Sequence, residues 1–419
     1  MGKSYIDNIP LPIYSITMRI RPVFLILLSG FVLFGCDYFS RVRSVEREDL
    51  FTLDIGVLED QIALFNFEGT SGMRRTDIAM REGLFYISDG NGGKILRFNS
   101  YGDLLFMIYN QETNPPPLTL QPLEEGSLVT RWSISHPLVE PGMITVDSRN
   151  HIFVRDRIPY ERRSFDTVNE VLLDNMILHF DADGRFIDYI GREGIGGTPF
   201  PRIEGLFTAG DDEIVVVSRL PGGWNIYWYD SAGFALFQIP LASDAIPIPP
   251  DREDVIPSLH TISVGHNARR LYIKVVYFRH IYDESTNART GIEPDSSVIW
   301  VMNAETGLWE RFIELPFFEQ TTVTQNQRTI SRMPYSLIGI TRSDRVFLSF
   351  PVPGGYSIRV MSLAEGAAGE QRRGFIEVDN RDMQFNAFDL SPDGILSAIL
   401  ANDWEVRLVW WRTDRFFRV

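Results

Sequence analysis

Four polar residues stand directly after apolar runs of the sequence, where they would end strands and present their side chains. They are Asp89, Asp156, Arg219 and Asn402. Carboxylate and amide oxygens are the ligands that hard cations prefer, so Asp89, Asp156 and Asn402 are candidate metal ligands. The same residue types also end strands by accepting hydrogen bonds from the amides of their own turns. The sequence leaves both interpretations open.

A second group of candidate functional residues is cationic. Arg157, Arg162 and Arg163 surround Tyr160 and lie close to Arg155 in the sequence. The chain has 55 acidic residues against 40 lysines and arginines, for a formal charge of −15. On such a chain, this cluster could bind an acidic partner or phosphorylated head groups, and a solvated loop is the alternative.

Motifs of the common catalytic mechanisms are absent from the sequence. It contains no Gly-x-Ser-x-Gly, His-Glu-x-x-His or Gly-x-x-x-x-Gly-Lys pattern, and its six histidines lack metal-ligand spacing. The acidic charge argues against general nucleic-acid binding, because that binding needs a basic surface to displace counterions. We therefore expect no nucleic-acid partner, and a binding protein is favoured over an enzyme.

The single cysteine of the chain follows a segment with the form of a secretory signal. Arg19 and Arg21 precede an apolar run at residues 23–34, which is too short for a comfortable transmembrane helix. Met18 is the expected initiator, because residues 1–17 lack the character of a signal. With one cysteine, no disulfide can form within the chain.

Residues 33–36, Leu-Phe-Gly-Cys, resemble the bacterial lipobox. The resemblance implies that the Cys36 thiol carries a diacylglycerol with palmitate-like chains, and that cleavage falls between Gly35 and Cys36. Residues 1–35 would then be a removed signal peptide, and residues 36–49 a lipidated N-terminus with a polar tether. A plain signal peptide or membrane anchor with an incidental cysteine is the alternative.

From about residue 50, the sequence repeats a unit of short apolar runs separated by turn residues. The expected inner strands of these units are residues 84–87, 151–154, 213–217, 271–276, 346–350 and 395–400. Each follows a shorter strand, and several precede a second hairpin that ends in glycine, such as Gly102, Gly184 and Gly233. Residues 215–217 are apolar on both faces, which is typical of stacked sheets, so the repeat predicts β-propeller blades.

Two segments resemble known propeller repeats. Residues 190–218 resemble the junction of NHL-type repeats, and residues 391–394, Ser-Pro-Asp-Gly, resemble a turn of TolB-like propellers. The arrangement also resembles spirochaetal propeller lipoproteins. These resemblances imply an all-β fold, a six-bladed β-propeller of four-stranded antiparallel blades over residues 50–419. The expected blades are residues 73–110, 141–191, 202–240, 258–316, 334–379 and 385–412, with a strand from residues 50–67 completing the last.

Three functions are consistent with this sequence. The favoured one is a lipid-anchored module of the cell envelope, on the periplasmic or surface face of a membrane, that binds an envelope protein as a scaffold. The second follows from a resemblance to six-bladed calcium-dependent lactonases, which would place Ca²⁺ among Asp89, Asp156 and Asn402. The third is a receptor for a carbohydrate or another small ligand. Fold alone does not decide among them.

Overall fold

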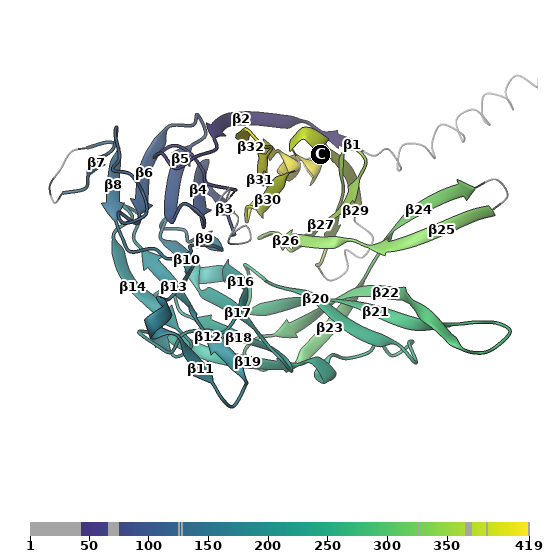
Figure 1. Cartoon of the computed structure of the whole chain (residues 1–419). Coiled ribbons are helices and arrows are strands. Elements are labelled where there is room, and N and C mark those ends of the chain that lie inside the picture. The colour runs from purple at the N-terminus through teal and green to yellow at the C-terminus, as the bar shows by residue number, and fades with distance from the viewer. Residues whose placement is uncertain are drawn as a thin grey trace, which may run out of the picture. The chain divides into compact units, whose positions relative to one another are not determined.

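A computed structural model describes residues 43–65, 75–124, 126, 129–324, 327–364, 371–382 and 384–417. These residues form strands β1 to β32 and five short 3-10 helices, so the predicted all-β propeller fold is confirmed (Figure 1). Among them, no helix has the length and apolar character needed to cross a membrane. The expected signal peptide, its cleavage site at Gly35 and the lipid-bearing Cys36 lie outside the described residues.

Five blades each follow one stretch of the chain outward from an innermost first strand, and blade 5 gains one outer strand from the N-terminal side of the described chain. Blade 1 contains β3 (Asp77–Arg81), β4 (Leu84–Asp89), β5 (Lys94–Asn99), β6 (Leu104–Tyr109), β8 (Trp132–Ser135) and β7 (Gln121–Pro122). Blade 2 contains β9 (Ile144–Val146), β10 (Ile152–Arg157), β13 (Asn175–Phe180), β14 (Phe186–Gly191) and β15 (Gly194–Ile195). Blade 3 contains β16 (Ile203–Thr208), β17 (Ile214–Leu220), β18 (Gly223–Tyr229) and β19 (Ala235–Ala242).

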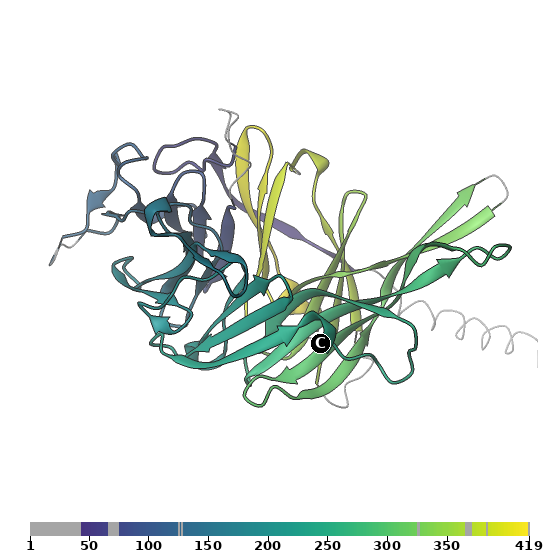
Figure 2. The same ribbon diagram turned by 60° about the horizontal axis from the view of Figure 1, so that its bottom comes forward.

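Blades 4 and 5 continue this series. Blade 4 contains β20 (Ile256–Val264), β21 (Arg270–Tyr282), β22 (Arg289–Asn303) and β23 (Trp309–Leu315). Blade 5 contains β26 (Ser336–Ile340), β27 (Arg345–Val352), β28 (Gly355–Ser362), β29 (Gln371–Glu377) and the parallel β1 (Arg43–Val45). Between the two blades, the hairpin of β24 (Phe317–Thr324) and β25 (Gln327–Pro334) projects beside the far part of β22 (Figure 2).

A further sheet closes the ring from both ends of the described chain. It contains β30 (Phe385–Leu390), β31 (Leu396–Ala401), β32 (Glu405–Trp411) and β2 (Arg47–Asp54). Because β2 pairs with β32, the predicted closing strand from the N-terminal side is found. Strand β30 contacts both β3 of blade 1 and β26 of blade 5, so the innermost strands form a continuous ring.

The predicted six equivalent blades of four antiparallel strands need correction. The ring has five blades that each follow one stretch of chain, and the last expected blade is the closing sheet that both chain ends share. Blades 1, 2 and 5 have more than four strands: β15 extends blade 2, and β8 and β1 join blades 1 and 5 in parallel. The tether boundary also changes, since residues 43–45 and 47–49 belong to β1 and β2 rather than to a tether.

Strand β17 shows why a run of residues that are all apolar, with no alternation of apolar and polar side chains, fits inside a blade. Ile214 and Val216 pack in a cluster with blade 2, whereas Val215 and Val217 pack in a cluster with blade 4. Both faces are therefore buried between neighbouring sheets, and none of the four side chains is more than 3% exposed. The sequence interpretation placed such runs innermost, which is wrong. They are second strands, and the shorter preceding strands surround the axis.

Candidate functional site

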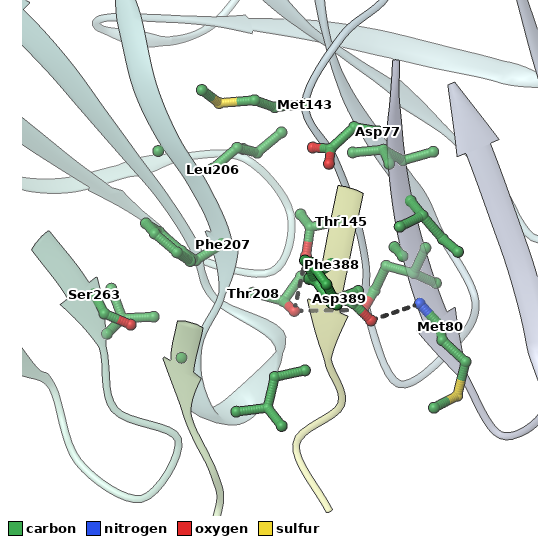
Figure 3. A pocket seen from close by; sticks show the side chains of 18 of the residues that line it. Asp77, Met80, Met143, Thr145, Leu206, Phe207, Thr208, Ser263, Phe388 and Asp389 are labelled. Atoms are coloured by element: carbon green, nitrogen blue, oxygen red, sulfur yellow. Dashed lines mark hydrogen bonds between the residues drawn. The ribbon is translucent and has the colours of Figure 1, made fainter. Parts of the chain in front are cut away.

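The innermost strands β3, β9, β16, β20, β26 and β30 surround a central channel of about 250 Å³. Each innermost strand is the edge of its sheet and directs its unpaired side toward this channel. The wall combines apolar and polar side chains, and Figure 3 shows Met143, Leu206, Phe207 and Phe388 among the apolar ones. The polar lining residues include carboxylates, hydroxyl groups and arginines.

The polar groups of the channel connect neighbouring sheets. The hydroxyl groups of Thr145 in β9 and Thr208 in β16 lie 3.2 Å apart and share a hydrogen bond. Asp389 in β30 accepts a hydrogen bond of 2.8 Å from the amide of Met80 in β3 (Figure 3). Asp77 begins β3, and its side chain remains 17% exposed because it faces the channel.

Burial changes the proton affinity of the two channel carboxylates. Burial raises the pKa of Asp389 to about 7, and the nearby Asp77 carboxylate adds to this rise, while the Met80 amide opposes it. Burial also raises the pKa of Asp77, against the effect of the Arg75 guanidinium. Two partly desolvated carboxylates repel each other, so this part of the channel favours a proton or another positive group.

Arginines gather at the end of the channel where the innermost strands begin. We name as the arginine mouth the five that line a cavity of about 600 Å³, namely Arg75, Arg155, Arg157, Arg202 and Arg219. A third cavity, of about 340 Å³, shares Arg75 and Arg202 with this mouth and Met143 and Phe207 with the channel. The three cavities therefore adjoin one another from the mouth to the channel.

Three members of the arginine mouth have carboxylate partners. The pairs are Arg157 with Glu140 (3.2 Å) and Asp174 (3.3 Å), Arg75 with Asp77 (3.6 Å), and Arg202 with Glu204 (3.5 Å). These pairs orient the arginine side chains and neutralise much of their charge. If the mouth contained only these three paired arginines, it would be polar rather than cationic.

Arg155 and Arg219 differ, because neither has a carboxylate partner in the described part of the chain. Nη1 of Arg155 donates to the carbonyl oxygen of Glu140 at 3.1 Å, and burial lowers the pKa of this guanidinium. The guanidinium of Arg219 lies 3.8 Å from the ring centroid of Trp224. Stacking occupies the face of a guanidinium and leaves its N–H edge able to bind a carboxylate or phosphate through two parallel bonds.

The strand register explains how these two arginines are held. Arg219 and Trp224 are paired directly across β17 and β18, and the indole Nε1 donates to Oε2 of Glu204 at 3.1 Å. The amide of Gly142 donates to the carbonyl oxygen of Arg155 at 2.8 Å. A Cβ atom at Gly142 would lie 2.5 Å from Nη2 of Arg155, so the glycine allows this close approach.

The candidate cation ligand Asp89 is used within its own blade. It is fully buried and accepts hydrogen bonds from the amides of Ala63 and Gly92 at 2.8 and 2.9 Å. Burial raises the pKa of Asp89, and the positive charge of Lys94 opposes this rise. Lys94 itself donates to the carbonyl oxygen of Leu58 at 2.6 Å, so this pair fixes the segment after β2 on blade 1.

The other two candidate cation ligands also bind backbone amides. Asp156 accepts hydrogen bonds from the amides of residues 139–140, at 3.0 and 2.6 Å, and burial raises its pKa to about 6. Oδ1 of Asn402 accepts bonds from the amides of residues 404–405, at 2.8 and 2.9 Å. Within the described ranges, no three His, Cys, Asp or Glu side chains gather as a metal site. Asn402 matches the turn-forming interpretation, whereas Asp89 and Asp156 also bind the amides of segments that lie 16 to 26 positions earlier in the chain.

The predicted cationic cluster around Tyr160 is divided in the structure. Arg157 lies in the arginine mouth, whereas Tyr160 and Arg162 belong to the outer 3-10 helix η1 (Tyr160–Arg162), where Tyr160 is 78% exposed. Arg163 lies 5.6 Å from the centroid of the Tyr160 ring and donates to the carbonyl oxygen of Ile158. The loop therefore packs on itself, and one of its four candidate residues, Arg157, reaches the arginine mouth.

Sequence reasoning missed Arg75, Arg202, Asp77 and Asp389 as site residues. Arg75 and Arg202 stand just before the innermost strands β3 and β16, so the place where short strands begin was the usable signal. Arg219 was recognised as a residue at a strand end, but its cation–π contact with an aromatic partner was not. Two carboxylates separated by more than 300 positions cannot be paired from sequence spacing.

Fold and cavities together define the chain as a β-propeller protein with an arginine-lined channel mouth. No known family pattern matches the sequence, and no curated protein sequence matches it. Among solved structures, the chain is similar to the propeller domain of the Trilobed protease from Pyrococcus furiosus, at 10% identity and a TM-score of 0.38, over 83% of this chain and 100% of that one.

Two further solved structures show similarity of the same degree. The Dos1 propeller has 7% identity and a TM-score of 0.36, over 88% of this chain and 95% of its own. A luciferin-regenerating enzyme has 10% identity and a TM-score of 0.31, over 80% of this chain and 99% of its own. These similarities concern the fold.

Proposed function

We propose that the protein is a ligand-binding module of the cell envelope that captures a carboxylate or phosphate group at the arginine mouth. One observation carries the proposal. Arg155 and Arg219 line the same cavity, and neither guanidinium is paired with a carboxylate in the described part of the chain. Guanidinium groups of this kind bind oxyanions through charge-assisted hydrogen bonds.

The surroundings of the mouth support a selective site. The formal charge of the chain is −15, so most of its surface repels anions and a local cationic cavity stands out against that background. The carboxylates of Glu140 and Asp174 are in ion pairs with Arg157, and although Glu140 and Asp156 act electrostatically on Arg155, neither forms an ion pair with it. The cavity is also concave, as ligand sites usually are.

The lipid anchor at Cys36 is the second part of the proposal. The lipobox resemblance supports it, and it would place the propeller on a membrane of the cell envelope, where its mouth could meet a free anion or an acidic group of an envelope protein. Mass spectrometry of the N-terminal peptide tests this part directly. A diacylated Cys36 is expected, with a Cys36→Ser variant released from membranes by washing. An unmodified Cys36 in the membrane fraction would contradict the anchor and leave the binding proposal standing.

Thermal unfolding with and without added oxyanions tests the binding proposal. Pyrophosphate and citrate present carboxylate or phosphate groups, and at about one hundred times its Kd a ligand stabilises the folded state by about 2.7 kcal/mol. We expect at least one of them to raise the Tm of the wild-type protein, and the double variant Arg155→Gln, Arg219→Gln to abolish the rise. Arg162→Gln is the matched control, because Arg162 is exposed on η1 outside the mouth.

The hydrolase alternative has less support from the site. Its candidate calcium ligands accept hydrogen bonds from backbone amides, either of their own turn or of a segment packed against it. No other described group takes their place as a metal site. The scaffold alternative remains compatible with the proposal, because an acidic segment of a partner could supply the anion. Equal Tm rises in the wild-type protein and in the double variant would overturn the arginine mouth as the binding site.

A further inference from the structure

The inner border of the arginine mouth carries a negative group. Asp77 stands two residues after Arg75, and its Oδ2 lies 3.6 Å from Nη2 of that arginine, which is its one ion pair among the described residues. Arg75 lines all three adjoining cavities, so this carboxylate marks the passage from the mouth into the channel. Other carboxylates also line these cavities: Glu140 and Asp174 are paired with Arg157, Glu204 with Arg202, and Glu170 is exposed at the mouth. For a ligand held by Arg155 and Arg219, Asp77 is the carboxylate on the channel side of this group.

Beyond Asp77, the channel wall carries a second negative group. Asp389 is the next carboxylate along the wall, bonded to the Met80 amide, and it interacts electrostatically with Asp77 (Figure 3). In the part of the chain that the structure describes, Asp77 has a loose ion pair with Arg75 and a weaker electrostatic interaction with Arg155, and Asp389 has no cationic partner. Carboxylates in a partly desolvated cavity are stabilised by a positive group brought in with a ligand.

Apolar side chains separate the two charged regions. Met143 and Phe207 line both the channel and the adjoining cavity of about 340 Å³. A purely anionic ligand would place its remaining part against these side chains and would be repelled by Asp77. A ligand with an amino group after a short aliphatic segment would satisfy all three regions, because each charge would meet its opposite.

We propose that the ligand of this site is a small zwitterion, with its carboxylate or phosphate on Arg155 and Arg219, its aliphatic part against Met143 and Phe207, and its ammonium group on Asp77. This inference rests on the proposed anion-binding function and deepens it by assigning the ligand class. Asp77 is then a specificity residue, which selects aminated over plain anions.

Calorimetric titration of the full mature chain with matched ligand pairs tests the inference. The pairs are 4-aminobutyrate with butyrate, 6-aminohexanoate with hexanoate, and 2-aminoethyl phosphate with ethyl phosphate. Within each pair the anionic group and the spacer are the same, so the ratio of the two affinities reports the amino group alone. We expect the aminated member of at least one pair to bind about ten-fold more tightly.

Variants of Asp77 locate the effect. Asp77→Asn should bring that ratio close to one without weakening the plain anion, and Asp77→Glu should retain part of the preference. Asp403→Asn is the control, because Asp403 is an exposed carboxylate outside the three cavities. Thermal unfolding of each variant shows whether it is folded, and the wild-type ratios test the proposal even if Asp77→Asn is unstable.

The outcomes separate the two proposals. If plain and aminated anions bind the wild-type protein equally, or if the preference survives in Asp77→Asn, the zwitterion assignment is wrong while anion binding stands. If no member of any pair binds, and pyrophosphate and citrate give no Tm rise, the proposed function and this inference fail together.

Discussion

The carboxylate of Asp389 accepts a hydrogen bond from the backbone amide of Met80 at 2.8 Å, across 309 positions of the sequence. Met80 lies in β3 of blade 1 and Asp389 in β30 of the closing sheet, so the bond joins the first and last sheets of the ring. Burial and the neighbouring Asp77 raise the pKa of Asp389 to about 7. The ring is therefore held together at this point by a group whose charge changes near neutral pH.

Replacing Asp389 by asparagine should stabilise the protein at alkaline pH. The pKa of Asp389 is about 7 in the folded protein and about 4 in an unfolded chain. The folded state therefore binds more protons between these values, and its stability falls as the pH rises through this window. The substituted amide stays neutral and can still accept the Met80 bond. We expect Asp389→Asn to gain about 1–3 kcal/mol at about pH 8 and almost nothing at about pH 4 in urea unfolding. An equal difference at both pH values would contradict a titration at this site.

Leu53 tests how strongly the N-terminal strand closes the ring. Leu53 in β2 is buried in a cluster with Phe85 of blade 1 and Val406 of the closing sheet. Leu53→Ala should destabilise the protein by about 2–4 kcal/mol, because it removes buried methyl groups and leaves a cavity. The neighbouring Thr52 is exposed, and Thr52→Ala should change stability by less than about 0.5 kcal/mol. Similar losses for the two variants would mean that β2 acts through its backbone alone.

The fold could be predicted from sequence because its signals are local. Runs such as residues 214–217 bury both faces, and turns such as the one at Gly184 need a backbone with a φ of 86° that glycine adopts freely. The count of equivalent blades and the identity of the innermost strand were wrong. Both depend on which strand edge faces the axis, and short strands such as β9 carry too few residues to show it.

The candidate site could be predicted only in part, because its residues meet through strand register. Arg157 and Arg219 follow recognisable apolar runs, whereas Arg75 and Arg202 precede short strands with weak patterns. Asp89 has the residue type of a cation ligand, yet its oxygens accept bonds from an amide of its own turn and from the amide of Ala63 in the segment after β2. The residue type indicates which ligand a side chain could bind. The tertiary contacts determine whether that side chain is already bound to another group of the protein.

Two histidines that are far apart in the sequence form a hydrogen-bonded pair in blade 2. Nδ1 of His151 lies 3.1 Å from Nε2 of His179, and Nδ1 of His179 lies 3.2 Å from Oδ1 of Asp188. Burial lowers the pKa of His179, while Asp188 opposes the shift and His151 adds to it. Because its folded pKa is lowered, the stability that neutral His179 provides is present above about pH 6.5 and is lost as the pH falls.

His179→Gln should therefore flatten the acid side of the stability profile. We expect the wild-type protein to lose more stability than His179→Gln between about pH 7 and pH 5. His280 lies on β21, away from this pair, so His280→Gln should keep the wild-type profile. Urea unfolding at the two pH values measures the difference. If both variants show parallel profiles, protonation of His179 is not what destabilises the protein in acid.

Gly142 offers a steric test of the arginine mouth that keeps every charge in place. A Cβ atom at this position would lie 2.5 Å from Nη2 of Arg155, which is the far end of a flexible side chain and can move. Gly142→Ala should therefore fold normally and displace the Arg155 guanidinium from the cavity wall. Because a bidentate contact depends on geometry, we expect affinity for an oxyanion ligand to fall about ten-fold, with a Tm within a few degrees of wild type.

The control must be a glycine whose backbone an alanine can adopt, which excludes Gly83 because it has a positive φ. Gly222→Ala, where the added atom meets open space and φ is not positive, should bind like the wild type. Unchanged affinity in Gly142→Ala would show that Arg155 does not contact the ligand, and would leave Arg219 as the main anion contact.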